Sequence, residues 1–228
     1  MITGKTVGIV ANGPSGSGQG PAIDGCDFVV RMKNWETYGP INAGQKISAL
    51  LAFNAPWADI TKEMEASKDW ELWCPYPTFD VNLVPPKMNS PETCVDWRWV
   101  LKAADGRVIR TISRGASSDI TNRIRSLSQV PNVFTTAGAA AIAMAIERSP
   151  GQLHLWGFDR VDDSAGNPHN DWAQVALTPQ MAKRNTMHDF VAEKKMICEL
   201  VDNKSWCGKP VAFPVIWHGR PTIPGVAQ

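Results

Sequence analysis

Residues 133–158, VFTTAGAAAIAMAIERSPGQLHLWGF, contain the clearest pattern of secondary structure in the chain. A strand ends near Thr136, and small apolar residues predict a helix over 139–148, which stops at Pro150-Gly151. The run at 152–158 predicts the next strand. Because parallel strands need a long crossover, usually a helix, this strand–helix–strand order predicts an α/β protein with a mostly parallel sheet.

Three more strands are predicted closer to the N-terminus. They lie at residues 5–11 (KTVGIVA), 26–31 (CDFVVR) and 47–53 (ISALLAF). Short apolar strands that end in polar turns are typical of a parallel sheet covered on both faces. The whole chain, 1–228, is expected to form one such domain.

Two further helices are predicted. Residues 117–130 place apolar side chains at helical spacing, with Ser117, Ser118 or Asp119 as the candidate N-cap. A long last helix is predicted from Thr178 to about residue 201. Its candidate buried residues are Met181, Met187, Phe190, Val191, Ile197 and Leu200.

The composition excludes several classes of protein. An apolar content of 43% excludes a disordered chain, and a formal charge of +1 excludes a general polyanion binder. No apolar run reaches the roughly 18–20 residues that span a bilayer, and no signal peptide is visible, so we expect a cytoplasmic protein. The five cysteines form no CxxC pair, which argues against a disulfide scaffold or a zinc site.

The chain has ten tryptophans but only two tyrosines. Residues 57–105 are rich in tryptophan and proline, and we expect loops and short helices there rather than a regular βαβ unit. The tryptophans of this segment are Trp57, Trp70, Trp73, Trp97 and Trp99. Flat indole faces could stack on the sugar ring or the base of an acceptor. Packing of a loop-rich lobe against the sheet is the other explanation.

Four glycines, Gly13, Gly16, Gly18 and Gly20, follow the first predicted strand. Their backbone N–H groups could bind a phosphate at the carboxyl edge of the sheet. The spacing fits no dinucleotide GxGxxG motif, because Pro21 stands at the last glycine position, and no Lys-Ser/Thr pair completes a Walker A loop. A ligand-binding loop and a plain flexible connection both remain open.

The turn before the alanine-rich helix is a second candidate phosphate site. Thr136 and Gly138 place a hydroxyl and N–H groups at a helix start, where a phosphate or a ribose could bind. A capped helix whose glycine permits close packing is the commoner explanation of such a pattern.

Two of the four histidines, His169 and His188, lie in polar surroundings after the last predicted strand. An imidazole can take or give a proton near neutral pH, so the two could act as a base and a leaving-group stabiliser, although each alone could be structural. His154 is expected to be structural, and His218 lies in an exposed-looking tail. No histidine cluster or Asp-x-Asp motif has metal-ligand spacing, so no metal site is predicted.

Four segments of the chain resemble, in the same order, the four motifs of the sialyltransferases of glycosyltransferase family 29. Residues 7–34 resemble the long motif, 135–159 the short motif, 169–172 the third motif, and His188-x4-Glu193 the very short motif. The resemblance implies a single-domain Rossmann-like variant of the GT-A fold. It also implies a CMP-activated sugar donor, metal-independent chemistry without a cofactor, and inversion at the sugar carbon.

The resemblance also implies roles for particular residues. His188 would deprotonate the acceptor hydroxyl, His169 would stabilise the leaving phosphate, and Arg31 and Glu193 would support the site. The implied donor contacts are Asn12, Gly13, Asn34, Asn54, Thr136, Gly138 and Gly157.

One departure from the family pattern concerns cysteine. Animal members join the long and short motifs by a disulfide, whereas here the long motif holds only Cys26, outside the expected position, and the short motif holds none. A cytoplasmic microbial or viral version of the family fits this departure.

The resemblance does not identify the acceptor, which could be a glycan or a modified nucleic-acid base. A nucleotide-sugar-binding protein without turnover is the alternative from another class. The failed GxGxxG motif argues against a Rossmann-type methyltransferase or dehydrogenase.

Overall fold

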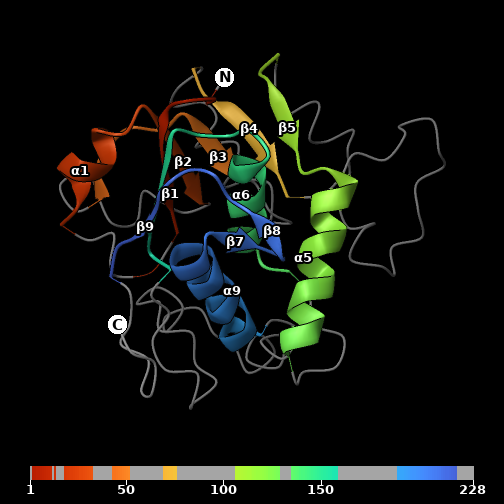
Figure 1. Ribbon diagram of the computed structural model, residues 1–228. Helices are drawn as coiled ribbons and strands as arrows, with labels where there is room; N and C mark the ends of the chain where they lie inside the picture. The colour runs from red at the N-terminus through yellow and green to blue at the C-terminus, as the bar shows by residue number, and fades with distance from the viewer. Residues whose placement is uncertain are drawn as a thin grey trace, which may run out of the picture.

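The computed structural model describes residues 2–11, 13, 18–32, 43–51, 69–75, 106–128, 135–158 and 189–219. These residues form a parallel sheet with helices on both faces (Figure 1). The predicted α/β architecture is therefore confirmed. Within residues 133–158 the helix and the second strand are present, over 137–146 and 152–156, whereas the predicted strand end is wrong at Thr135 and Thr136, which are not in a strand, and residues 133–134 lie outside the described ranges.

The sheet has seven strands within the described ranges, in the order β5-β4-β3-β2-β1-β6-β9. The strands are β1 (Thr6–Val10), β2 (Phe28–Met32), β3 (Ala49–Leu51), β4 (Glu71–Cys74), β5 (Ile109–Thr111), β6 (Gln152–Trp156) and β9 (Val215–Trp217). All of these pairs are parallel. From β1 the chain builds outward in one direction to β5 and then crosses to the other side at β6. The pair β1–β6 is thus the topological switch point of the sheet, where α/β proteins place their ligands.

Among the described residues, three helices cover one face of the sheet: α5 (Arg114–Leu127), α6 (Ala137–Ile146) and α9 (Phe190–Asn203). Figure 1 shows α6 across the middle of the sheet, with α5 and α9 on either side of it. The α6 helix has a buried run of small and apolar residues, 139–145, and these short side chains let it lie close to Val7 and Ile9 of β1. This face contains the main core.

The opposite face carries a smaller cluster around Trp156. Short helix α1 (Gly20–Asp24) contributes Ile23, which packs with Val10, Val29 and Trp156. Gly8 of β1 leaves room for the indole, because a Cβ there would lie 2.9 Å from the Trp156 ring. An antiparallel hairpin, β7 (Ser205–Trp206) and β8 (Lys209–Pro210), follows α9.

The predicted strands at 5–11, 26–31, 47–53 and 152–158 are all present, each with slightly different ends. The predicted N-cap of the helix at 117–130 is wrong: Ser113, not Ser117, Ser118 or Asp119, caps α5. Ser113 has an extended backbone, and its hydroxyl accepts a hydrogen bond from Ala116 N–H at 3.0 Å. The first turn of α5 is polar, so apolar periodicity does not show it in the sequence.

The expectation of loops and short helices in 57–105 is wrong at β4, an inner strand of the sheet. Trp70 and Trp73 are 3% and 0% exposed, so these two pack in the interior and do not stack on an acceptor. Trp57, Trp97 and Trp99 lie outside the described residues.

The last helix is present over Phe190–Asn203, but the prediction of one continuous helix from Thr178 is wrong at Asp189, which has an extended backbone and caps α9. Residues 178–188 lie outside the described ranges, and α9 is described from Phe190, after Asp189. Ile197 and Leu200 are buried as expected, whereas Val191 is 44% exposed, which contradicts its predicted burial. Met181 and Met187 lie outside the described residues, and so does the side chain of Phe190.

Candidate functional site

The switch point brings two predicted donor-site residues into contact. At the carboxyl ends of β1 and β6, Ala11 N–H donates to the Trp156 carbonyl at 2.8 Å, and Gly13 N–H donates to the Gly157 carbonyl at 3.0 Å. The glycine-rich segment after β1 and the turn after β6 therefore lie side by side. This is where the sheet topology predicts a ligand site.

Gly157 is required by its backbone and by its neighbours. Its φ is +72°, a value that residues with a Cβ rarely adopt. A Cβ at this position would lie 2.1 Å from the Ala11 carbonyl oxygen and 2.9 Å from Gly13 N. The glycine thus permits the close crossing of the two chain segments.

The N-terminus of α6 forms the next part of the site. Thr136 is the N-cap, and its hydroxyl accepts from Ala139 N–H at 3.3 Å. A Cβ on Gly138 would lie 2.9 Å from the Phe158 ring, so Phe158, which follows Gly157, packs on the first turn of α6. The N-terminal end of a helix carries a partial positive charge that favours anions such as phosphate.

Glu193 connects α9 to this helix end. It lies in the first turn of α9, and its carboxylate accepts hydrogen bonds from both the hydroxyl and the N–H of Thr136, the latter at 3.3 Å. Asp189 caps α9, because its Oδ1 accepts from Ala192 N–H at 2.9 Å. Glu193, the last residue of the predicted very short motif, is therefore hydrogen-bonded to Thr136 of the predicted short motif.

Arg31 lies on β2 and its side chain is fully buried. Its Nε–H donates to the Lys46 carbonyl at 2.8 Å, and Nη2 lies 3.6 Å from Asp24 Oδ1. Burial lowers the pKa of Arg31 to about 10, and the Asp24 carboxylate opposes this shift. Asp24 also accepts from the N–H groups of Gln45 and Lys46, so the arginine helps to fix the approach to β3.

Five predicted site residues lie along one edge: Gly13, Thr136, Gly138, Gly157 and Glu193. Arg31 lies on β2, the strand next to β1, and its side chain contacts the Lys46 carbonyl and Asp24. The other candidates, Asn12, Asn34, Asn54, His169 and His188, lie outside the described residues, so their roles stay predictions.

Two residues at this edge were not predicted. Phe158 packs on Gly138, and Asp189 caps α9. An aspartate directly before an apolar helical pattern is a standard N-cap signal, so Asp189 could have been found from the sequence. Nothing in the sequence indicates the contact of Phe158 with Gly138.

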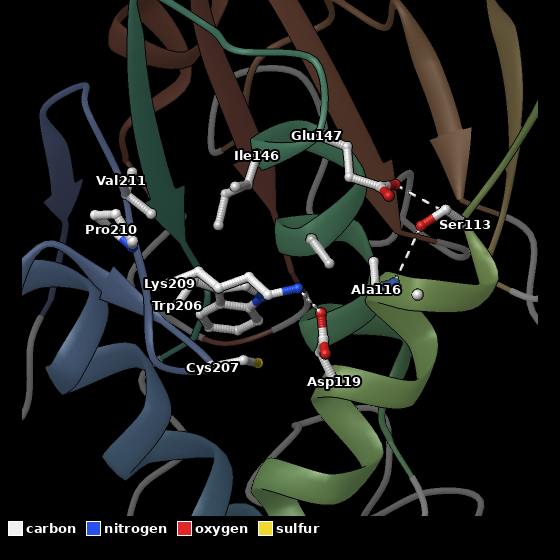
Figure 2. A pocket seen from close by; sticks show the side chains of 12 residues that line it. Ser113, Ala116, Asp119, Ile146, Glu147, Trp206, Cys207, Lys209, Pro210 and Val211 are labelled. Carbon is white, nitrogen blue, oxygen red and sulfur yellow. Dashed lines mark hydrogen bonds and ion pairs between the residues drawn. The ribbon is translucent and has the colours of Figure 1, made fainter.

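A separate cavity of about 220 Å³ lies at the other end of α6 (Figure 2). Lys209 reaches across it to form an ion pair with Asp119, and Glu147 accepts from Ser113 N–H at 3.4 Å. Since Glu147 follows the last residue of α6 and Thr136 caps the first turn, this cavity is not part of the predicted donor site. Within the described ranges, no group of three or more His, Cys, Asp or Glu side chains could hold a metal ion.

The model of glycosyltransferase family 29 (sialyltransferase) matches residues 7–205, which is most of the chain and includes Ala11, Gly13, Trp156 and Gly157. The chain belongs to glycosyltransferase family 29. A search of curated proteins found no match.

Solved sialyltransferases share the fold. A mammalian sialyltransferase matches with a TM-score of 0.54 and 18% identity over 86% of this chain and 66% of that one. The sialyltransferase CstII from Campylobacter jejuni, solved with the substrate analogue CMP-3FNeuAc, matches with a TM-score of 0.52 and 14% identity over 94% of this chain and 80% of that one. An α-2,3-sialyltransferase from Campylobacter jejuni in apo form gives a TM-score of 0.53 and 13% identity over 98% and 80%.

These matches confirm the predicted Rossmann-like glycosyltransferase fold of this family 29 protein. The chain spans about two thirds of the length of the mammalian enzyme. Among the residues that the structure describes, no helix is both long and apolar enough to cross a membrane.

Proposed function

We propose that this family 29 protein is an inverting, metal-independent glycosyltransferase that uses a CMP-activated sugar. One observation carries the proposal: the α6 N-terminus, capped by Thr136 and held by Glu193, lies beside the Gly13–Gly157 contact at the switch point of the sheet. Such an arrangement favours a nucleotide phosphate. A structural neighbour, CstII, was solved with CMP-3FNeuAc, which supports a CMP-linked donor.

The donor phosphate is assigned to the first turn of α6. Thr136 N–H is bonded to Glu193, and Ala139 N–H is bonded to the Thr136 hydroxyl. We therefore assign the N–H groups of Ala137 and Gly138 to the phosphate oxygens. Gly13 and Gly157 let the backbone approach the nucleotide closely, and Asn12, Asn34 and Asn54 are assigned to further donor contacts.

The transfer step needs a base and a stabilised leaving group. His188 removes the proton of the acceptor hydroxyl while that oxygen attacks the anomeric carbon from the face opposite the phosphate. The bond from the sugar carbon to the phosphate oxygen breaks, and CMP leaves with the electron pair. His169 donates a hydrogen bond to the phosphate, where negative charge increases in the transition state. Attack from the opposite face inverts the configuration.

The site has two substrates, the nucleotide-sugar donor and an acceptor that we take to be a glycan. We place the enzyme in the cytoplasm. A modified nucleic-acid base would require a local basic surface near the site, and binding to DNA that weakens steeply with salt would favour that acceptor instead.

The first test is a thermal-shift comparison of CMP, UDP-sugars, NAD and S-adenosylmethionine, each with EDTA. We expect stabilisation by CMP without divalent metal.

The second test measures CMP release from CMP-sialic acid with a panel of glycan acceptors. His188→Ala should lose transfer and keep CMP binding, whereas His154→Gln, a histidine on β6, should keep both. Full transfer by His188→Ala would disprove the mechanism.

A further inference from the structure

A side-chain contact joins the end of α5 to the start of α9. The Ser128 hydroxyl, at the C-cap of α5, donates to Asp189 Oδ2 at 2.5 Å. The other oxygen of the same carboxylate, Oδ1, accepts from Ala192 N–H and caps α9. A hydroxyl that donates to a carboxylate over such a short distance makes a strong, charge-assisted hydrogen bond. Asp189 therefore both starts α9 and ties it to α5.

The first turn of α9 extends this connection to α6. Glu193 N–H donates to the Asp189 carbonyl at 3.1 Å, and the Glu193 carboxylate holds Thr136. The hydroxyls of Thr121 on α5 and Thr135 lie 3.4 Å apart. The C-terminal half of α5 thus supports the N-terminal ends of both α6 and α9.

We propose that Ser128 and Asp189 are positioning residues for the general base. The inference rests on the proposed function, because His188 is the residue directly before Asp189 in the chain. A cap alone fixes Asp189 relative to its own helix. The bond to Ser128 fixes it relative to α5, and through Glu193 relative to the α6 end that we assign to the donor phosphate. We therefore expect the contact between Ser128 and Asp189 to fix the position of the general base relative to the donor.

The effect should fall on turnover rather than on donor binding. A catalytic group displaced by about 1 Å can lower the rate by up to about a hundredfold, because the reacting atoms no longer meet in the productive geometry. Loss of the Ser128 hydroxyl leaves the cap contact from Asp189 to Ala192 in place. It also leaves the contacts of Glu193 with Thr136. We expect a small displacement of the chain before α9, with the donor site unchanged.

The test uses the full chain and CMP-sialic acid with the acceptor found in the panel. Ser128→Ala should lower kcat about tenfold and change the KM for the donor by less than about twofold. Ser128→Thr keeps a hydroxyl and should restore kcat. Ser126→Ala is the matched control, because the Ser126 hydroxyl donates only within α5, to the Arg123 carbonyl at 2.7 Å. It should leave kcat unchanged.

A second variant keeps the test decisive if Ser128→Ala is unstable. Asp189→Ser can still cap the helix, but its side chain is too short to reach Ser128 as well. It should lower kcat by as much as Ser128→Ala, and the double variant should lose no more than Asp189→Ser, since both remove one interaction. The acid limb of the pH–kcat profile should also move in these variants, because the base changes its surroundings.

The outcomes separate the two claims. If His188→Ala is inactive but Ser128→Ala and Asp189→Ser have wild-type kcat and pH profile, the inference is overturned and the proposed function stands. Equal losses in Ser128→Ala and Ser126→Ala also overturn it. If His188→Ala transfers sugar at the full rate, the proposed function itself fails.

Discussion

Gly13 donates its backbone N–H to the carbonyl oxygen of Gly157 at 3.0 Å, across the switch point of the sheet. This contact joins the segment after the first strand to the turn after β6. The family match extends over both segments, so the contact lies within the part of the chain that matches the family. Part of the candidate donor site is therefore built by a hydrogen bond between backbone groups, which the side chains alone would not indicate.

Gly157→Ala should destabilise the protein and weaken CMP binding. The added methyl group meets the Ala11 carbonyl at 2.1 Å while φ stays at +72°, so strain and steric overlap add to about 3 kcal/mol or more. Gly106→Ala is the matched control: its φ is +79°, but a Cβ there has nothing within 4 Å, and we expect about 1 kcal/mol. Urea unfolding measures both, and equal losses would contradict the steric argument.

Thr136 and Glu193 should be energetically coupled. Thr136→Ala removes the cap hydroxyl and should cost about 1 kcal/mol of unfolding free energy. Glu193→Ala removes the acceptor of that hydroxyl, so the double variant should cost less than the two single losses together, by about 0.5 kcal/mol or more. Both single variants should also bind CMP more weakly by calorimetry. Glu199→Ala, which breaks the ion pair of α9 with Arg123, should leave CMP affinity unchanged.

His154 and His218 form a pair outside the candidate donor site, and their contact predicts that the stability of the protein depends on pH. His154 Nδ1 and His218 Nε2 are 2.9 Å apart in rings tilted by 13°, and the His218 ring stacks on Trp156 with centroids 4.3 Å apart. Burial lowers the pKa of both imidazoles, and the charge of His218 lowers the pKa of His154 further.

The sign of this effect follows from proton uptake. An unfolded histidine titrates near pH 6.5, and the folded protein takes up these protons only at lower pH, so acid favours the unfolded chain. The contribution to stability is complete above about pH 6.5 and is lost as the pH falls through the lowered folded pKa values. We expect the Tm to fall between pH 7 and pH 5 less steeply in His154→Gln/His218→Gln. Parallel Tm curves would exclude the pair as the cause.

Arg31→Ala should be strongly destabilising. It removes a fully buried side chain whose Nε–H donates to the Lys46 carbonyl, and the cavity together with the lost hydrogen bond should cost about 2–5 kcal/mol. Arg31→Met keeps much of the side-chain volume and should cost less. Alanine at the exposed Arg125 should change unfolding by about 0.5 kcal/mol or less, and a similar loss there would show that the burial of Arg31 is not the reason.

The sequence predicted the elements whose pattern is local. Short runs rich in apolar residues identified β1, β2, β3 and β6, because strands covered on both faces are mostly apolar. The alanine-rich run identified α6 for a similar reason. The last strand, β9, was missed because Pro214 precedes it and its apolar run is only three residues long. The expectation that His218 lies in an exposed tail is wrong for the same reason. His218 directly follows β9, and its backbone N–H donates to the Leu155 carbonyl.

The site was predictable only in its residue types. Thr136, Gly138 and Glu193 could be selected from their motifs, but the contact of Thr136 with Glu193 depends on how α9 packs beside the start of α6. No periodicity or capping rule carries that information, because it arises from tertiary packing. The link from Ser128 to Asp189 is of the same kind: each residue has a local capping role, and only the fold brings them together.

The contact between Thr136 and Glu193 has a consequence for protein engineering and for evolution. The two residues are 57 positions apart, yet one supplies the donor and the other the acceptor of a single contact. A chimera that took the segment around α6 from another family member would have to take the start of α9 from the same parent. For the same reason, positions 136 and 193 should covary among family members: a substitution at one should be accompanied by a substitution at the other that restores the contact.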